Sequence, residues 1–111
     1  MTGELKPWSI RYTENAKNDL FSIVTYINDV LLEPLVAKAM YSDIVSAIRS
    51  LETMPYRFHI YDVKPWSERK IRVLRIRKYL VFYLPQKTTH TVLILRIIYS
   101  GRDISKQLEE K

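Results

Sequence analysis

The sequence predicts an α+β domain in which two helices lie on one face of an antiparallel sheet. Apolar residues recur at helical spacing through residues 14–31 and 34–53. Segments rich in β-branched and aromatic residues then follow, joined by short links. Helices grouped along the chain apart from strands are typical of α+β architecture. With 111 residues in total, we expect one domain spanning residues 1–111.

The N-terminal half is expected to form a strand and a helical hairpin. Residues 8–12 alternate apolar and polar side chains, which indicates a short strand with one wet side. Thr13 suits the N-cap of the first helix, 14–31, and Pro34 suits the first turn of the second, 34–53. Because only two or three residues link the helices, we expect them to be antiparallel.

The C-terminal half is expected to supply three or four antiparallel strands. Residues 69–76, 79–85 and 91–98 have strand composition, and the links between them are tight. An irregular strand is expected near 58–63, and one or two helical turns within 102–110. The sheet face away from the helices has no obvious cover in this arrangement. Surplus Arg and Lys are therefore expected on that face or at its rim.

The charge of the chain is unevenly placed. Residues 1–54 hold five Lys and Arg against seven Asp and Glu, a net −2, whereas residues 55–111 hold thirteen against five, a net +8. Cysteine is absent, so disulfides, thiol nucleophiles and Cys-ligated zinc are excluded. No stretch approaches the roughly 18 apolar residues of a membrane span, and no apolar signal core begins the chain. We expect a cytoplasmic protein without a membrane partner.

The most informative segment is RKIRVLRIRK, residues 69–78. It holds six positive charges and no acid, interleaved with β-branched apolar residues. A hairpin with one apolar and one basic side is expected, and its basic side suits phosphates or an acidic protein. The candidate phosphate- or RNA-binding residues are Arg69, Lys70, Arg72, Arg77 and Lys78, beside Arg75. A solvated face without a ligand is the alternative.

Other chemistry has little support in the sequence. The two histidines, His59 and His90, lack a second ligand at metal spacing, so no metal is expected. The two glycines cannot form a phosphate-cradling loop, and no G-x-S-x-G motif is present. No cofactor is therefore expected.

Four segments in their order resemble the RelE/ParE superfamily of bacterial toxins. They are WSIRYT at 8–13, the apolar pattern of 37–48, RVLRIRKYLVFY at 72–83, and LRIIY followed by GRD within 95–103. The resemblance implies a toxin of a type II toxin–antitoxin, or plasmid-stabilisation, pair with a cognate acidic antitoxin. RelE-like members cut messenger RNA on the ribosome without a metal, whereas ParE-like members poison DNA gyrase.

For RNA cleavage, the resemblance assigns four residues as candidates. Arg75 aligns with the basic-strand arginine that contacts the scissile phosphate, and Tyr99 with a terminal tyrosine that handles protons. Arg96 and Arg102 lie near the family's second arginine. RelE-like members place lysines on the strand before the first arginine, at the positions that Ile71 and Val73 hold here.

Four functions therefore follow from the sequence. Ribosome-dependent mRNA cleavage comes first, and non-catalytic inhibition of gyrase second. A nucleic-acid-binding module and an inactive homologue that only binds its antitoxin are the remaining two.

Overall fold

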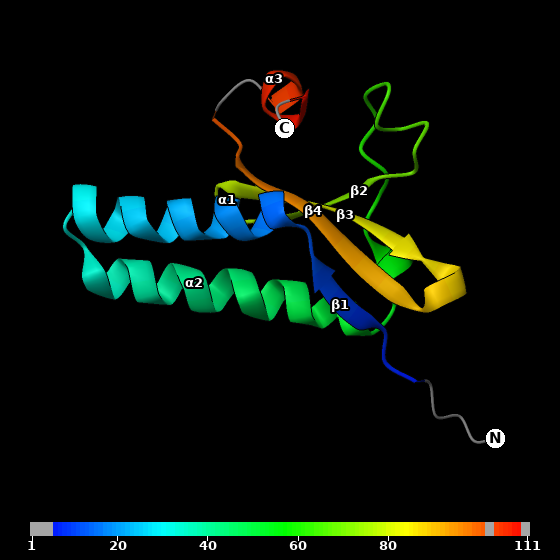
Figure 1. The fold of residues 1–111 in the computed structure, drawn as a ribbon, viewed down its shortest axis with the longest axis horizontal. Helices are drawn as coiled ribbons and strands as arrows, with labels where there is room; N and C mark the ends of the chain where they lie inside the picture. Colours follow the sequence, from blue (N-terminus) through cyan, green and yellow to red (C-terminus); the bar gives the residue numbers. More distant parts are fainter. Residues whose placement is uncertain (1–5, 102–103, 110–111) are drawn as a thin grey trace.

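The structure is a computed structural model that describes residues 6–101 and 104–109. Two antiparallel helices pack on one side of a four-stranded sheet, and a short third helix lies at its other side (Figure 1). In chain order the elements are β1 (Ser9–Tyr12), α1 (Glu14–Thr25), α2 (Pro34–Arg49), β2 (Arg72–Ile76), β3 (Tyr79–Gln86), β4 (Thr91–Tyr99) and α3 (Ile104–Glu109).

The sheet has the order β1-β4-β3-β2. The three C-terminal strands are antiparallel neighbours, as the sequence predicts. The N-terminal strand adds to β4 in parallel, from the pair Ser9–Thr91 to the pair Tyr12–Ile94, so the complete sheet is mixed. β4 continues beyond β1 to Tyr99, and this leaves one edge of its C-terminal half without a strand neighbour.

The helical hairpin begins and turns where the sequence predicts, with one irregularity. The Thr13 hydroxyl accepts a hydrogen bond of 3.0 Å from the amide of Ala16, which caps α1. The first helix does not run regularly to residue 31, because α1 gives way to a π-helical turn over Tyr26–Val30. Leu32 then adopts a left-handed conformation with φ of 56°, which is uncommon for a non-glycine residue.

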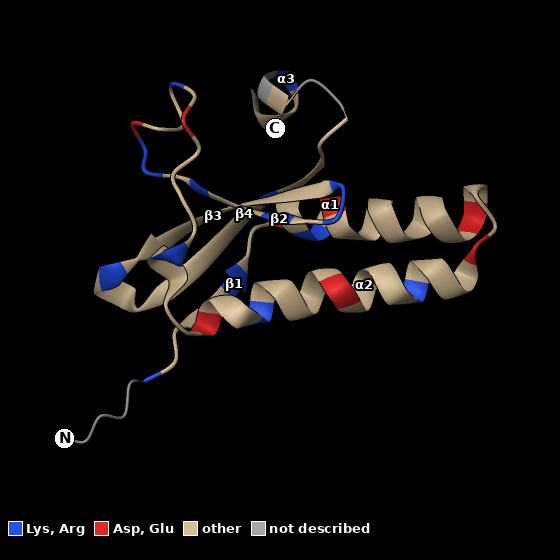
Figure 2. Ribbon diagram, turned by 180° about the vertical axis from the view of Figure 1, so that it is seen from behind, with Lys and Arg blue, Asp and Glu red and all other residues tan. Residues whose placement is uncertain are grey.

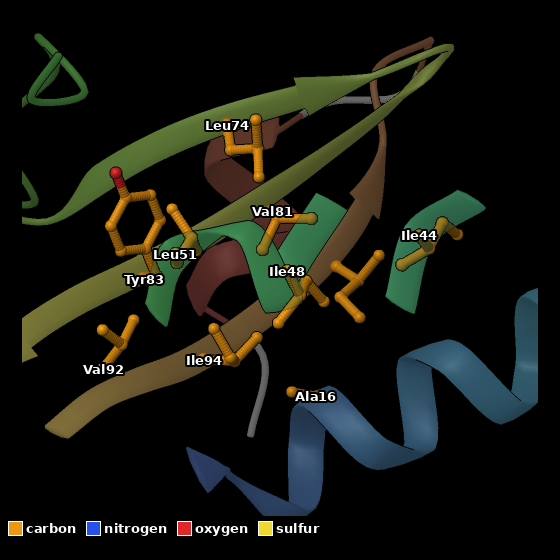
Figure 3. Packing of buried hydrophobic residues seen from close by; sticks show 10 residues of the cluster. Ala16, Ile44, Ile48, Leu51, Leu74, Val81, Tyr83, Val92 and Ile94 are labelled. Carbon is orange, nitrogen blue, oxygen red and sulfur yellow. The ribbon is translucent and has the colours of Figure 1, made fainter. Parts of the chain in front are cut away.

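The main core lies between the hairpin and the sheet (Figure 3). Both the helices and the strands bring branched aliphatic side chains to it, and the strands add the ring of Tyr83. The Tyr83 ring is fully buried there, and its hydroxyl donates a hydrogen bond of 2.7 Å to the carbonyl of Pro55. Other members of this core are Ala16, Ile44, Ile48, Leu51, Leu74, Val81, Val92, Ile94 and Ile97.

The opposite sheet face is covered, contrary to the expectation that it would be open. Trp66, in the loop before β2, packs there against Val73, Phe82 and Ile98. Ile104 and Leu108 of α3 add to this second cluster. The expected strand at 58–63 is reduced to an isolated bridge between Ile60 and Arg72, and β2 begins at Arg72 and not at residue 69 as predicted.

Candidate functional site: a cationic sheet edge and an apolar hairpin tip

The basic segment runs along the outer edge of the sheet, from the loop before β2 to the turn after it (Figure 2). We call its six cations the cationic edge: Arg69, Lys70, Arg72, Arg75, Arg77 and Lys78. β2 is an edge strand, so these residues follow one another along an open margin of the sheet, with Arg72 and Arg75 on opposite faces. They differ in whether their charge is already used within the protein.

Arg72 is used within the protein. Its Nη1 donates hydrogen bonds to the carbonyls of Tyr56 at 3.1 Å and Phe58 at 2.7 Å. Its guanidinium also lies 5.0 Å from the centre of the Tyr56 ring, a cation–π contact. Arg72 therefore fastens the 55–58 turn to β2, and its expected role in phosphate binding stays a prediction.

Arg77 is neutralised by a carboxylate of α2. Its Nε and Nη2 both donate to Asp43 Oδ2, at 2.9 Å and 2.6 Å. The pair ties the β2–β3 turn to the helical hairpin. Both side chains are partly exposed, so the net contribution to stability is expected to be small.

The other four cations are the open part of the edge, which we call the open cations: Arg69, Lys70, Arg75 and Lys78. All four are exposed, and none belongs to an ion pair among the residues that the structure describes. The one hydrogen bond recorded for their side chains runs from Arg75 Nη1 to the carbonyl of Arg77, at 3.1 Å. The nearby Glu68 faces Lys64 instead, at 3.9 Å.

Arg75 and Tyr99 lie on opposite faces of the sheet. Arg75 pairs with Leu80, which pairs with Ile98, and this row faces the second cluster. The next row runs through Tyr79 to Tyr99 and faces the helices. Successive residues of a strand point to opposite faces, so the two side chains cannot meet at one phosphate in this fold.

Arg96 is held by a carboxylate of α1. Its Nε and Nη2 donate to the two oxygens of Asp19, at 2.7 Å and 3.0 Å, and its Nη1 donates to the carbonyl of Gln107 at 2.7 Å. Only 15% of the Arg96 side chain and 17% of the Asp19 side chain are exposed. Arg96, on β4, therefore links this strand to both α1 and α3 through hydrogen bonds. Arg102, the fourth predicted catalytic residue, lies outside the described residues.

Tyr99 borders a hollow beside the helices. The hollow, of about 600 Å³, is also lined by Asp19, Lys78 and Tyr79. The Tyr99 ring lies 5.8 Å from the ring of Tyr79 between centres. Gly101 approaches it so closely that a Cβ there would lie 2.5 Å from Tyr99 Cε2. An exposed phenol, a lysine and a carboxylate therefore share one surface, without Arg75.

A second surface, the apolar tip of the hairpin, was missed at the level of sequence. Leu32 is 75% exposed and Leu35 is 82% exposed, although both are large apolar side chains. The sequence signal was the apolar run VLLEPLV at 30–36. Helical periodicity divides this run between the end of the first helix and the start of the second, so it does not stand out as one exposed cluster. We define the apolar tip as Tyr26, Val30, Leu31, Leu32, Leu35 and Val36. Exposed apolar clusters of this kind mark interaction sites.

Metal and membrane features were searched over the described ranges 6–101 and 104–109. Within them, no three His, Cys, Asp or Glu side chains lie together as metal ligands could. No helix in the same ranges is long and apolar enough to cross a membrane.

The strand order, the helical hairpin and the basic edge strand define a toxin fold of the RelE/ParE type. The family model described as the ParE toxin of the type II toxin–antitoxin system parDE matches residues 10–104. The chain belongs to this family and is a toxin of the ParE/RelE class. None of the curated proteins matches it at a significant level.

Three solved structures share the fold. A chain of the chromosomal ParDE toxin–antitoxin system of P. aeruginosa is 22% identical with a TM-score of 0.68, over 83% of this chain and 95% of that one. A chain of the RelBE2 toxin–antitoxin complex of Mycobacterium tuberculosis is 20% identical with a TM-score of 0.61, over 89% and 98%. The isolated E. coli RelE toxin is 12% identical with a TM-score of 0.54, over 90% and 92%.

Proposed function

We propose that this toxin acts as a non-catalytic inhibitor of DNA gyrase, in the manner of ParE. The observation that carries the proposal is the separation of Arg75 from Tyr99 on opposite sheet faces. Cleavage of RNA requires groups for proton transfer and charge stabilisation around one phosphate. Arg96, which would have to supply charge beside Tyr99, is already paired with Asp19. Inhibition by binding needs no such convergence.

The apolar tip supports a protein target. The turn that carries Leu32 and Leu35 stands at the end of the hairpin farthest from the sheet (Figure 1), whereas Tyr26 and Leu31 line the hollow beside Tyr99. A partner that covers Leu32 and Leu35 would bury apolar area now in contact with water, at roughly 25 cal/mol per Å². The irregular backbone of the tip, with its π-helical turn and left-handed Leu32, is also typical of functional positions.

A cognate antitoxin is the second partner that we propose. The ParDE system and the RelBE2 complex named above are both toxin–antitoxin assemblies. An acidic antitoxin segment would be attracted by the net +8 of residues 55–111. The antitoxin would hold the toxin inactive until it is removed.

A supercoiling assay with purified gyrase tests the proposal. The wild-type toxin is expected to block supercoiling and to accumulate gyrase-cleaved DNA. The variant Leu32→Ser/Leu35→Ser should lose most of this inhibition, because it removes the two most exposed leucines of the tip. The matched control is Met54→Ser, which removes a 69% exposed apolar side chain beyond the other end of α2 and should inhibit normally. A wild-type toxin that neither blocks supercoiling nor traps cleaved DNA would reject gyrase as the target.

Ribosome-dependent, metal-independent mRNA cleavage is the second candidate, and one observation favours it. Tyr99 shares its hollow with Lys78 and Asp19, so groups able to transfer a proton or stabilise charge are near one another. A translation extract tests this candidate with Tyr99→Phe and Arg75→Ala variants. Cleaved mRNA that depends on Tyr99 would establish it, and intact mRNA with normal synthesis would exclude it. A toxin that fails both assays yet binds its antitoxin would be an inactive homologue.

A further inference from the structure

We infer that the open cations contact the sugar–phosphate backbone of double-stranded DNA, so that the toxin touches the DNA as well as the gyrase to which it is bound. The inference rests on the proposed function and adds a second ligand to it. The apolar tip would contact protein, and the outer edge of β2 would contact the DNA that gyrase holds. Arg69, Lys70 and Arg75 lie outside the hollow that Lys78 shares with Tyr26 and Leu31 of the apolar tip. One toxin could therefore use these three cations and the tip at once.

The first argument is uncompensated charge. Arg77 forms an ion pair with Asp43, and Arg72 donates to two backbone carbonyls. Among the described residues, none of the open cations belongs to an ion pair. Figure 2 shows cationic positions at both ends of β2. Duplex DNA carries one negative charge per roughly 1.7 Å of its axis, and it releases counterions when cations replace them. A row of free cations gains more from such a ligand than from any single anion.

The second argument is the linear arrangement of the open cations. Arg69 and Lys70 precede β2, Arg75 lies on it, and Lys78 follows it. At about 3.3 Å per residue, the five residues of β2 alone span roughly 13 Å. Arg75 lies on the side of the second cluster and Lys78 on the side of the helices. A long anion that meets the strand edge-on, such as a duplex backbone, therefore fits the open cations better than one phosphate in a pocket.

The third argument separates duplex from single-stranded nucleic acid. Proteins that bind single strands interleave cations with exposed aromatic rings on which bases stack. Here Trp66 is only 6% exposed, and it packs in the second cluster with Tyr61. The Tyr56 ring is exposed, but one of its faces is occupied by the Arg72 guanidinium. The edge thus offers charge without stacking platforms, which suits a duplex backbone.

The fourth argument separates DNA from an acidic peptide. A peptide would bind this edge best by adding a strand to β2. Residues 59–61 already occupy half of that edge, because the amide of Tyr61 donates to Ile71 at 2.8 Å and the amide of Val73 donates to His59 at 3.1 Å. Only the Arg75 end of β2 stays accessible to an added strand. Phosphates need side-chain cations alone and are not limited in this way.

The experiment measures binding of the full-length toxin to a 30-base-pair duplex as salt is varied. The test variant is Arg69→Gln/Lys70→Gln/Arg75→Gln. Lys78 is left intact because its side chain also lines the hollow of Tyr99. The matched control is Arg11→Gln/Arg49→Gln/Lys87→Gln, which removes three exposed cations outside the edge and the same net charge. Urea unfolding of both variants verifies that they are folded.

For the wild type we expect a log–log salt slope of about −3 to −4, since each phosphate contact contributes about −0.9. The test variant should bind at least tenfold more weakly at low salt, with a slope near −1, while the control keeps the wild-type slope. Equal losses in the two variants would overturn the inference, because binding would then follow net charge alone. So would tighter binding of a single-stranded RNA or of a poly-glutamate peptide with the same number of charges.

The supercoiling assay distinguishes failure of this inference from failure of the proposed function. Inhibition of gyrase without edge-dependent DNA binding removes the inference and leaves the function. Edge-dependent duplex binding without gyrase inhibition removes gyrase as the target, whereas the phosphate contacts stand.

Discussion

One carboxylate oxygen of Asp19, on α1, accepts hydrogen bonds both from the Arg96 side chain and from the backbone of β4. Its Oδ2 accepts from Arg96 Nε at 2.7 Å and from the amide of Ile97 at 2.9 Å. The amide lies on the part of β4 that extends past β1 and lacks a strand neighbour there. One carboxylate thus neutralises an arginine that is mostly buried and takes the place of a missing strand.

We predict that Asp19→Ala lowers the free energy of unfolding by about 3 kcal/mol. The substitution leaves a mostly buried guanidinium and a strand amide without their acceptor, and breaking such a pair is strongly destabilising. Urea denaturation measures the loss. Asp43→Ala is the matched control, because it breaks the more exposed pair with Arg77 and should cost only about 0.2–1 kcal/mol. Equal losses for the two variants would contradict the structural role of Asp19.

We predict that Tyr83→Phe lowers the free energy of unfolding by about 1 kcal/mol at neutral pH. The substitution leaves the Pro55 carbonyl without the hydroxyl that donates to it at 2.7 Å. Thermal or urea unfolding measures the change. Tyr41→Phe, at an exposed position on α2, should change the free energy of unfolding very little. A neutral Tyr83→Phe variant would indicate that water satisfies the carbonyl.

We predict that Tyr83 makes the free energy of unfolding fall at high pH. Burial raises the pKa of Tyr83 to about 12 from its ordinary 10.0, with smaller opposing effects from Arg72 and Arg57. Because the folded state holds this proton more tightly, its contribution is complete below pH 10 and is lost as the pH rises from 10 towards 12. The difference in unfolding free energy between wild type and Tyr83→Phe should therefore shrink across that interval. A difference that stays constant would show that the hydroxyl titrates normally.

We predict that Gly101→Ala is costly only while Tyr99 keeps its ring. A Cβ at position 101 would lie 2.5 Å from Cε2, 2.9 Å from Cζ and 3.1 Å from the hydroxyl oxygen of Tyr99. Overpacking of this kind costs roughly 1–3 kcal/mol, and the 39% exposed ring can move, so about 1 kcal/mol is expected. In a Tyr99→Ala background the same substitution should cost almost nothing. A double-mutant cycle by urea unfolding measures the coupling, and additive effects would exclude the contact.

We predict that Leu32→Gly raises the free energy of unfolding by roughly 0.5 kcal/mol. Leu32 has φ of 56°, a backbone conformation that costs most residues about 1–2 kcal/mol. Glycine avoids this cost but loses more conformational entropy on folding, so the net gain is smaller. Leu35→Gly is the control, because it removes a similarly exposed leucine from the regular helix α2 and should lower stability by about 0.5–1 kcal/mol. If both glycines destabilise equally, the left-handed turn carries no strain.

The sequence predicted what depends on neighbours along the chain. Helical spacing located α1 and α2, Thr13 and Pro34 marked their first turns, and β-branched runs located the three C-terminal strands. The sequence did not predict the pairing between segments that are far apart along the chain. The parallel addition of β1 to β4, and the packing of Trp66 and α3 on the second face, depend on contacts that no local period encodes.

The candidate site was predictable in composition but not in geometry. The run 69–78 was expected to form a hairpin with one apolar and one basic side, and this was wrong, because Arg72 and Arg75 lie on opposite faces of β2. Only coordinates separate Arg72 and Arg77, which have partners, from the open cations. The apolar spacing of residues 14–31 puts Asp19 on the polar side of the first helix, and a helical period cannot reveal that a strand passes beside that position. The bulge in β4 near Arg96 likewise shifts the alternation of facing sides without a sequence signal.

The parallel pairing of β1 with β4 also constrains how this toxin is made. Ser9 and Thr91 meet across more than eighty intervening residues, so the first strand has no neighbour until the last one has been synthesised. Contacts of such long range slow folding. The helices also lack the core side chains of β4, which are Val92, Ile94 and Ile97, until that strand has been made. A nascent chain therefore lacks this pairing until β4 has been synthesised, and its first strand stays an unpaired edge up to that point.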